Sequence, residues 1–302
     1  MKRLADWWFA PAPAERLAAL RIAIGGFALV YTVARLPELV AVAQLESSSF
    51  HGVGIASATG VLPPSAVLAI AIATCVLLAA FTLGVAHRYL APVAALALIW
   101  TCSYRSSWGQ LFHTENLMAL HVLALAVSPA ADSWALDGRR GSIDARRGAR
   151  VSPTGYGWPI KLLAALTAAT YVIAGLAKLR LSGATWLDGD QLRAQIAIDN
   201  LRKALLGDAT APLATVVLGH PLWLAVGSVA AIAVELGAPI ALLGGRIARG
   251  WAVAAWGFHV TVVLTMNIWF PYPLFGFAFL PLLPVERPFR WVAAWVAAHL
   301  RS

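Results

Sequence analysis

Long runs of apolar residues recur along the chain and leave little room for a soluble fold. Several of these runs approach ~20 residues, the length at which an α-helix crosses ~30 Å of hydrocarbon. Charged residues make up only 12% of the 302 residues, roughly half of their usual share in a soluble domain. The sequence therefore predicts an integral membrane protein whose first partner is the lipid bilayer.

The apolar runs predict an all-α fold, a polytopic bundle of about eight transmembrane helices within a single domain over 1–302. The third, fourth and eighth candidate spans are short and are expected to be tilted or partly re-entrant. A Trp-rich amphipathic helix over 1–16 is expected to lie on the membrane surface, with Arg16 among the lipid headgroups. The candidate spans are 17–40, 66–86, 89–104, 115–130, 159–180, 222–244, 250–268 and 271–285.

Lysine and arginine gather in alternate segments between the spans. The N-terminus, the turn at 87–88, the Arg-rich loop 131–158, the turn at 245–249 and the C-terminus hold most of them. By the positive-inside rule, these segments and both termini are expected to be cytoplasmic. The same distribution argues against nucleic acid as a partner, although the formal net charge is +9. The arginines of the loop are Arg139, Arg140, Arg146, Arg147 and Arg150.

Segment 181–221 conflicts with this rule, because it is expected outside the membrane and yet contains Arg193, Arg202 and Lys203. Its apolar residues recur with helical spacing, which predicts an amphipathic helix on the outer surface. The rule weakens as loops lengthen, so the topology is kept.

Lys178 lies near the outer end of the span 159–180, on one helical face with Tyr171 and Gly175. One interpretation is a snorkelling anchor whose ammonium reaches the headgroups. The other is a group that faces a site, where the glycine allows close approach of a neighbour or ligand. Ionisable side chains inside spans usually face the bundle interior.

The turn before the fourth span carries Trp108, His113 and Glu115 and is expected at the same face of the membrane as Lys178. These residues are candidates to share one pocket with Lys178. A simpler interpretation is a polar helix start, with Thr114 as its N-cap and Glu115 stabilised by the helix dipole.

Three further ionisable residues lie deeper in the spans. His121 lies on roughly the same predicted face as His113, and it is either part of the site or a core histidine bonded to a backbone carbonyl. Glu235 and His259 lie in adjacent spans and are expected to form a buried pair, either structural or the floor of a site. No zinc spacing is present, and Cys75 and Cys102 are expected to be buried core residues without a disulfide.

These residues and motifs together resemble the membrane domain of vitamin K-dependent gamma-carboxylases and of their bacterial relatives, the horizontally transferred transmembrane domain (HTTM) proteins. The strongest match is formed by Gly175, Lys178, Leu179, Trp186 and Gly189. The resemblance implies a bacterial inner (plasma) membrane as the location. The stretches that carry it are "LRIAIGGFALVY" (20–31), "GVLPPS" (60–65), "SWGQLFHTENL" (107–117), "AGLAKL…TWLDG" (174–189) and "FHVTVVLTMNIWFPYPL" (258–274).

The resemblance implies a reaction and a set of residues. Lys178 matches the base that deprotonates a reduced naphthoquinone (vitamin K or menaquinone hydroquinone), which then reacts with O2 and yields its epoxide. The strong base formed in this way removes a glutamate γ-proton, and CO2 traps the carbanion. His113 matches an assisting histidine, although Phe112 replaces the asparagine that precedes it in the carboxylases. No metal is implied. The residues expected to line the quinone site are Tyr171, Gly175, Trp108, Trp186, His121, Glu235 and His259.

The working hypothesis is therefore a membrane enzyme related to the gamma-carboxylases. A separate substrate protein or peptide is a further expected partner, because no soluble lumenal domain follows the eighth span as it does in the carboxylases. Two alternatives stay open: a non-enzymatic membrane carrier or partner subunit, and a quinone-linked redox subunit that forms no epoxide.

Overall fold

The computed structural model describes residues 2–139 and 153–299, and these described residues form helices and turns without a strand. Four helical stretches in this part of the chain are long and apolar enough to cross a membrane. They are α2 (Ala14–Val42), α3 (Pro64–Leu83), the stretch 154–186 that contains α8 (Gly157–Ser182), and α12 (Gly245–Met266). The all-α fold class is confirmed, whereas the number of eight spans stays a prediction.

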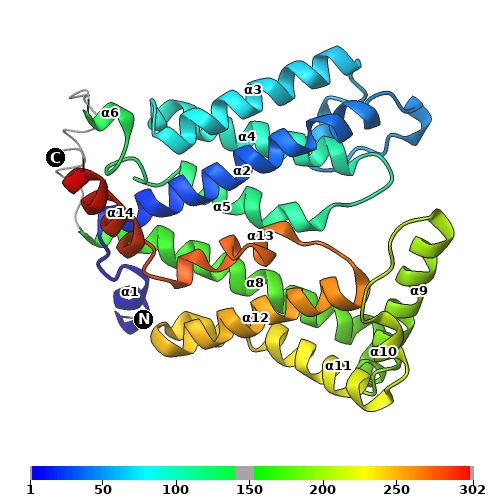
Figure 1. The fold of residues 1–302 in the computed structure, drawn as a ribbon. Helices are drawn as coiled ribbons and strands as arrows, with labels where there is room; N and C mark the ends of the chain where they lie inside the picture. The colour runs from blue at the N-terminus through cyan, green and yellow to red at the C-terminus, as the bar shows by residue number, and fades with distance from the viewer. Residues whose placement is uncertain (1, 140–152, 300–302) are drawn as a thin grey trace. The chain divides into compact units, whose positions relative to one another are not determined.

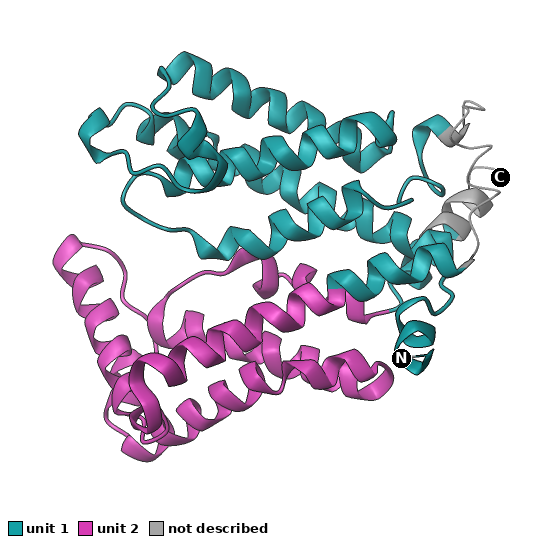
Figure 2. Ribbon diagram, turned by 180° about the vertical axis from the view of Figure 1, so that it is seen from behind, with its two compact units in different colours: residues 1–163, 284–302 teal, residues 164–283 magenta. Residues whose placement is uncertain are grey.

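The chain divides into two compact units, which Figure 2 shows in different colours. Unit 1 contains residues 1–163 and 284–302, and unit 2 contains residues 164–283. The boundary falls inside α8. The prediction of a single domain over 1–302 stays a prediction.

Four helices form the body of unit 1: α2, α3, α4 (His87–Ser106) and α5 (Asn116–Ala126). α2 packs against α3 and α5, and α4 packs against the same two helices, so the four enclose a common core (Figure 1). Their apolar faces explain this packing, because a helix that is apolar on most sides must be covered by other helices or by lipid. The fourth predicted span, 115–130, is shorter than expected, since α5 ends at Ala126.

The N-terminal surface helix is shorter than the predicted range 1–16. α1 (Lys2–Trp8) ends before Pro11 and Pro13, which have no N–H to continue a helix, and α2 begins at Ala14. Arg16 therefore belongs to α2, where its guanidinium donates two hydrogen bonds of 2.8 Å to Glu286 at the start of α14 (Glu286–His299). The expectation that Arg16 lies among lipid headgroups stays a prediction, and the structure adds that its guanidinium is paired with a carboxylate of unit 1.

Unit 2 is organised around α12, which packs against most of the other helices described there. The predicted spans 222–244 and 271–285 are helical but interrupted, because Pro239 follows the end of the first helix and Gly276 lies between the parts of the second. Proline lacks the N–H for a helix interior, and Gly276 has a φ of +82° that glycine adopts without strain. The other helices of unit 2 are η5 (Gly183–Trp186), α9 (Asp190–Leu206), α10 (Ala214–Leu218), α11 (Pro221–Leu236), η6 (Ala238–Leu243), α13 (Pro271–Leu274) and η7 (Phe277–Leu282).

The segment 181–221 contains the expected amphipathic helix, α9. Its buried side carries polar groups: Asn200 donates to the carbonyl of Thr265 (3.0 Å), and Lys203 donates to the carbonyl of Met266 (2.6 Å). These bonds fix α9 to the C-terminal end of α12. Its opposite side exposes apolar side chains, including Ile198 and Leu205, an arrangement suited to contact with lipid rather than water.

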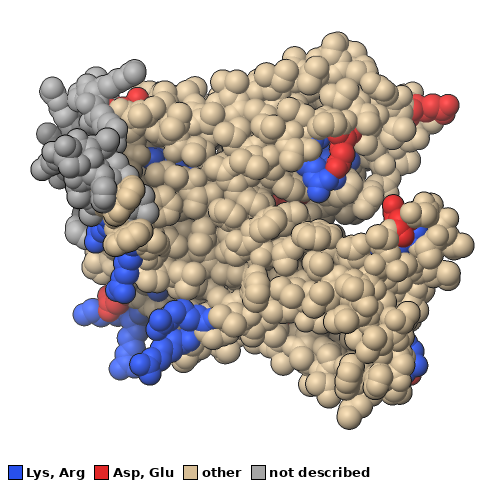
Figure 3. All heavy atoms as spheres, in the orientation of Figure 1, with Lys and Arg blue, Asp and Glu red and all other residues tan. Residues whose placement is uncertain are grey.

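Charged side chains are sparse along the helices. Among the described residues on the face drawn in Figure 3, lysine and arginine gather near helix ends and most of the remaining surface is uncharged. Arg140, Arg146, Arg147 and Arg150 of the predicted cytoplasmic loop 131–158 lie outside the described residues.

Candidate functional site

Lys178 is held by a buried carboxylate near the end of α8. Its ammonium donates to Oε1 of Glu235, which lies at the end of α11. The side chain of Glu235 is 3% exposed and that of Lys178 24%. Nζ lies 5.4 Å from the ring centroid of Trp186 and 5.8 Å from that of Phe258. This geometry differs from a snorkelling anchor, because the ammonium points at protein groups.

Tyr171 and His259 form a second buried pair. The Tyr171 hydroxyl and Nε2 of His259 are 2.7 Å apart, and the Tyr171 ring also packs edge-on against Trp251 at 5.0 Å. The predicted pair between Glu235 and His259 is therefore wrong. Each of the two residues has a different partner, and both partners come from α8.

Gly175 allows these partners to meet. Tyr171, Gly175 and Lys178 lie on one face of α8, and a Cβ atom at position 175 would lie 2.9 Å from Leu236 Cδ2 and 3.0 Å from Glu235 Cβ. Only a glycine lets α11 approach α8 this closely without displacement. The close approach brings the Glu235 carboxylate within reach of the Lys178 ammonium.

The turn after α8 places Trp186 beside Lys178. Trp186 is buried in η5, and Gly189 follows it with a φ of +93° as α9 begins. A Cβ atom at position 189 would lie 2.6 Å from the backbone nitrogen of Ala225 in α11. Glycine is thus required at this position for two reasons, the left-handed backbone and the close contact with α11.

Three buried polar atoms in this region of unit 2 have no hydrogen-bond partner: Glu235 Oε2, His259 Nδ1 and Trp186 Nε1. Buried polar atoms are usually paired, so an unpaired group marks either strain or a missing ligand. The five residues Lys178, Glu235, Tyr171, His259 and Trp186 are called the Lys178 cluster below. The cluster combines an amine, a carboxylate, an imidazole and aromatic surfaces within one unit.

The other predicted site residues lie in unit 1. Trp108 is a core residue, with its ring 5.2 Å from Phe50 and 5.8 Å from Tyr104. His121 is fully buried in α5, and its Nε2 lies 3.1 Å from the carbonyl oxygen of Leu163, the contact expected of a core histidine. His113 is exposed in η3 (His113–Glu115). A pocket shared by these residues and Lys178 stays a prediction.

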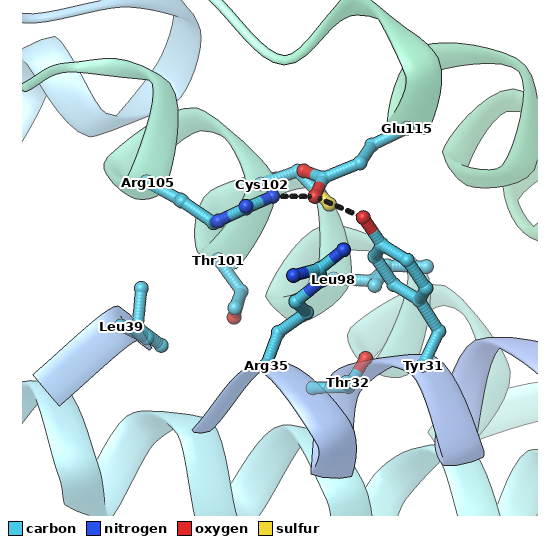
Figure 4. A pocket seen from close by; sticks show the side chains of 9 residues that line it. All are labelled: Tyr31, Thr32, Arg35, Leu39, Leu98, Thr101, Cys102, Arg105 and Glu115. Atoms are coloured by element: carbon cyan, nitrogen blue, oxygen red, sulfur yellow. Dashed lines mark hydrogen bonds and ion pairs between the residues drawn. The ribbon is translucent and has the colours of Figure 1, made fainter. Parts of the chain in front are cut away.

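Unit 1 also contains an ionic network that the sequence did not reveal. Arg105 binds Glu115 and donates to Glu38 over 2.6 Å, and the Tyr31 hydroxyl donates to Glu115 over 2.8 Å. Figure 4 shows Tyr31, Arg105 and Glu115 at a cavity of about 20 Å³, which has room for one water molecule. Thr114 is not the N-cap of α5, because α5 begins at Asn116 and Glu115 occupies the capping position without a capping bond.

In the sequence, Arg105 is noticeable only as the single cation of its outer turn, ten residues before Glu115. A lone cation between apolar spans is a weak signal for a buried pair, since an exposed turn residue gives the same pattern. Among the described residues, no group of three or more His, Cys, Asp or Glu side chains is placed to hold a metal ion.

A model of the HTTM domain family matches residues 9–286. The match covers most of the chain and includes both the Lys178 cluster and the Arg105 network. No curated protein and no solved structure matches the chain.

Proposed function

Because the chain belongs to the HTTM domain family, whose membrane domains are linked to vitamin K-dependent carboxylase, we propose that it is a membrane enzyme that uses a reduced naphthoquinone and O2. The observation that carries the proposal is the Lys178–Glu235 pair, an amine and a carboxylate held together against aromatic rings at a helix end. Such a combination of titratable groups and apolar surface is typical of sites for small lipophilic molecules.

The Lys178 cluster fits the chemistry of a quinol. A reduced naphthoquinone has a flat aromatic body, for which Trp186 and Phe258 offer ring surfaces, and hydroxyl groups that need hydrogen-bond partners. The unpartnered atoms Glu235 Oε2 and His259 Nδ1 can supply these partners. When bound, the quinol would supply the electrons with which O2 is reduced and a strong base is generated.

The ion pair makes an amine available without a change in net charge. Ammonium–carboxylate and amine–carboxylic acid differ only in the position of one proton, and Lys178 and Glu235 are close enough to exchange it directly. Lys178 then accepts a proton from the bound quinol hydroxyl, and Glu235 holds the proton that Lys178 gave up.

His113 is assigned the assisting role of the family histidine that it matches in sequence. Its exposed position in η3 leaves its ring accessible to a ligand. CO2 and a separate substrate protein or peptide complete the set of reactants if the carboxylation half of the family reaction operates in this chain.

We further propose eight spans in the bacterial inner membrane with both termini cytoplasmic. Several of the cations that violate the positive-inside rule are paired with carboxylates. Lys203 and Arg202 both bind Asp199, and Arg105 lies between two carboxylates. An impermeant maleimide applied to intact spheroplasts is expected to label Asp208→Cys but not Arg246→Cys, and the reverse pattern would overturn the orientation.

The enzymatic proposal is tested with purified protein, vitamin K or menaquinone hydroquinone, and O2. We expect the quinone epoxide to form, and we expect Lys178→Ala to reduce its rate at least ~100-fold, the range typical of a lost general base. Arg246→Gln, at an exposed cation of α12, serves as the control. Absence of epoxide, or epoxide formation that Lys178→Ala leaves unchanged, would contradict the proposal.

The ion pair also supports an alternative, a non-enzymatic carrier or partner subunit, because an ion pair between α8 and α11 also holds these two helices together. Lys178→Arg separates the two functions. Arginine keeps the charge and the bond to Glu235 but does not lose its proton. A base role predicts that Lys178→Arg is folded and inactive, whereas a fastening role predicts that it behaves like the wild type.

A further inference from the structure

Trp251 joins α12 to the end of α11 beside the Lys178 cluster. The residue lies in the second turn of α12 and is 5% exposed. Its indole Nε1 donates a hydrogen bond of 2.9 Å to the carbonyl oxygen of Val234 in α11. Val234 directly precedes Glu235, the carboxylate that holds Lys178. The bond therefore attaches the two helices at the residue next to the ion pair.

The carbonyl of Val234 lies where a helix needs a donor from outside. The last four carbonyls of a helix have no partner within it, and Val234 belongs to the last turn of α11. The helix does not continue through Pro239, which has no N–H, and the chain enters η6 instead. A carbonyl without a donor is costly where water is scarce. The indole N–H of Trp251 therefore stabilises α11 with its end at this place.

The ring of Trp251 contacts a second member of the cluster. The Tyr171 ring packs edge-on against it at a centroid distance of 5.0 Å, and Phe279 packs edge-on at 5.9 Å. The Tyr171 hydroxyl lies 2.7 Å from Nε2 of His259. One side chain thus contacts α11 through its N–H and α8 through its ring, and α8 and α11 are the two helices that carry the ion pair.

The place of the Glu235 carboxylate is determined from two sides. Gly175 allows Glu235 to approach α8, and Trp251 holds the backbone one residue earlier against α12. A shift of this helix end changes the distance between the carboxylate and the Lys178 ammonium. Misplacement of reacting groups by about 1 Å can slow a reaction about 100-fold. The proton exchange proposed for the pair is therefore sensitive to the bond that Trp251 donates.

We propose that Trp251 is a positioning residue for the Lys178–Glu235 pair. Its N–H holds the end of α11 and its ring supports Tyr171, so that the amine and the carboxylate stay close enough for direct proton exchange. The inference rests on the proposed function, because it gives the geometry of the pair a role in the base step. Trp251 acts through Glu235 and is assigned no contact with the quinol.

The first measurement needs no quinol. A double-mutant cycle with Lys178→Met and Glu235→Leu, followed by thermal unfolding of the full chain in detergent, gives the coupling between the two residues. We expect this coupling to fall to about half or less when the cycle is repeated with Trp251→Phe, which keeps a ring but has no N–H. A merely structural role would lower the melting temperature and leave the coupling unchanged.

Trp256→Phe is the matched control. Trp256 also lies in α12, and its Nε1 also donates a bond of 2.9 Å to a backbone carbonyl, that of Leu274, away from the ion pair. Its loss removes a bond of the same kind and is expected to leave the coupling as in the wild type. If Trp251→Phe does not fold, 3-benzothienylalanine at position 251 removes only the donor, because it has the shape of tryptophan without the N–H.

The second measurement is epoxide formation from vitamin K hydroquinone and O2. We expect Trp251→Phe to lower kcat about tenfold and to leave KM nearly unchanged, because the pair is displaced while the contacts of the quinol remain. Trp256→Phe is expected to keep the wild-type kcat. An unchanged kcat in Trp251→Phe, or an equal loss in both variants, would overturn the positioning role.

The two measurements separate this inference from the proposed function. Coupling that is unchanged in Trp251→Phe, or lost equally in Trp256→Phe, would overturn the inference even if the wild type forms epoxide. A wild type that forms no epoxide would contradict the proposed function. In that case, coupling that depends on the Trp251 N–H would still support the positioning of the pair by Trp251.

Discussion

At the scale of single residues, the pair between Lys178 and Glu235 combines two requirements. A charge in an apolar span is costly unless it is paired, and removal of one partner leaves the other uncompensated. The same closeness that neutralises the charges also lets a proton pass between them. Stability and the proposed chemistry therefore depend on the same bond.

Glu235→Gln is expected to destabilise the protein by about 2 kcal/mol, because it leaves the Lys178 ammonium without its carboxylate. The partial exposure of Lys178 keeps the loss below that of a fully buried pair. The double variant Lys178→Met/Glu235→Leu is expected to lose less stability than the sum of the losses in Lys178→Met and Glu235→Leu. A double-mutant cycle with these three variants measures the difference.

The measurement is thermal unfolding in detergent, followed by tryptophan fluorescence. Glu46→Gln is the control, because the Glu46 side chain is exposed and accepts a long bond of 3.4 Å from Ser48. Additive losses in the cycle would show that Lys178 and Glu235 do not stabilise one another.

At this scale, the site itself stays a prediction, but the structure shows which of its predicted residues contact one another. Lys178, Tyr171, Gly175, Trp186, Glu235 and His259 were all expected near a site, and unit 2 contains all six. The pairing of Glu235 was predicted incorrectly, because helical periodicity reports which residues share a face of one helix but not which face of another helix it meets. The Arg105 network was missed for the same reason.

At the scale of helices, the contact between α8 and α11 depends on the absence of a side chain. Gly175 lies in the middle of an apolar helix, where glycine is otherwise unfavourable by about 1 kcal/mol relative to alanine. Its presence is explained by Leu236 and Glu235, which occupy the space that a Cβ atom would need.

Gly175→Ala is expected to destabilise the protein by about 1–3 kcal/mol through overpacking, in spite of the better helix propensity of alanine. Gly250→Ala is the matched control. Gly250 also lies inside a long helix, α12, but a Cβ atom there would have no neighbour within 4 Å. This variant is expected to be neutral or more stable by roughly 0.5–1 kcal/mol. The measurement is thermal unfolding of both variants. Equal effects of the two substitutions would contradict the explanation that Gly175 is required by the close contact with α11.

Helices were predictable where apolar runs are long and uninterrupted, as in α2, α3 and α12. The interruptions within helices were not predictable, because the effect of Pro239 or Gly276 depends on whether a neighbouring helix satisfies the freed backbone groups. The positions of these residues indicate that the helix is locally irregular. The residue at which a helix ends, however, depends on packing.

At the scale of the whole molecule, unit 1 is discontinuous in sequence. The chain leaves it within α8 and returns at Pro284. The bond between Arg16 and Glu286 joins the two parts, and its partners are 270 positions apart in the sequence. The separation of the chain into two units could not be read from the sequence, because composition changes little along it.

Stability is expected to depend on pH through this bond. The hydrogen bond from Arg16 holds the pKa of Glu286 below its ordinary value of 4.5. Folding therefore gains stability from the ionised carboxylate above that value, and the gain is lost as the pH falls through the lower pKa of the folded state. Glu286→Gln is expected to lower the melting temperature at pH 7 and to have a smaller effect at a pH below the lowered pKa of the folded state. An equal effect at both pH values would contradict the role of the ionised group.

The bond between Arg16 and Glu286 can form only late in the synthesis of the chain. A nascent chain leaves the ribosome from its N-terminus, so the Arg16 guanidinium is exposed to the translocation machinery long before Glu286 has been translated. All of unit 2 emerges in the interval, so the bond that joins the two parts of unit 1 can form only after unit 2 has been synthesised. A chain halted before Glu286 would leave the guanidinium of Arg16 in α2 without its carboxylate partner.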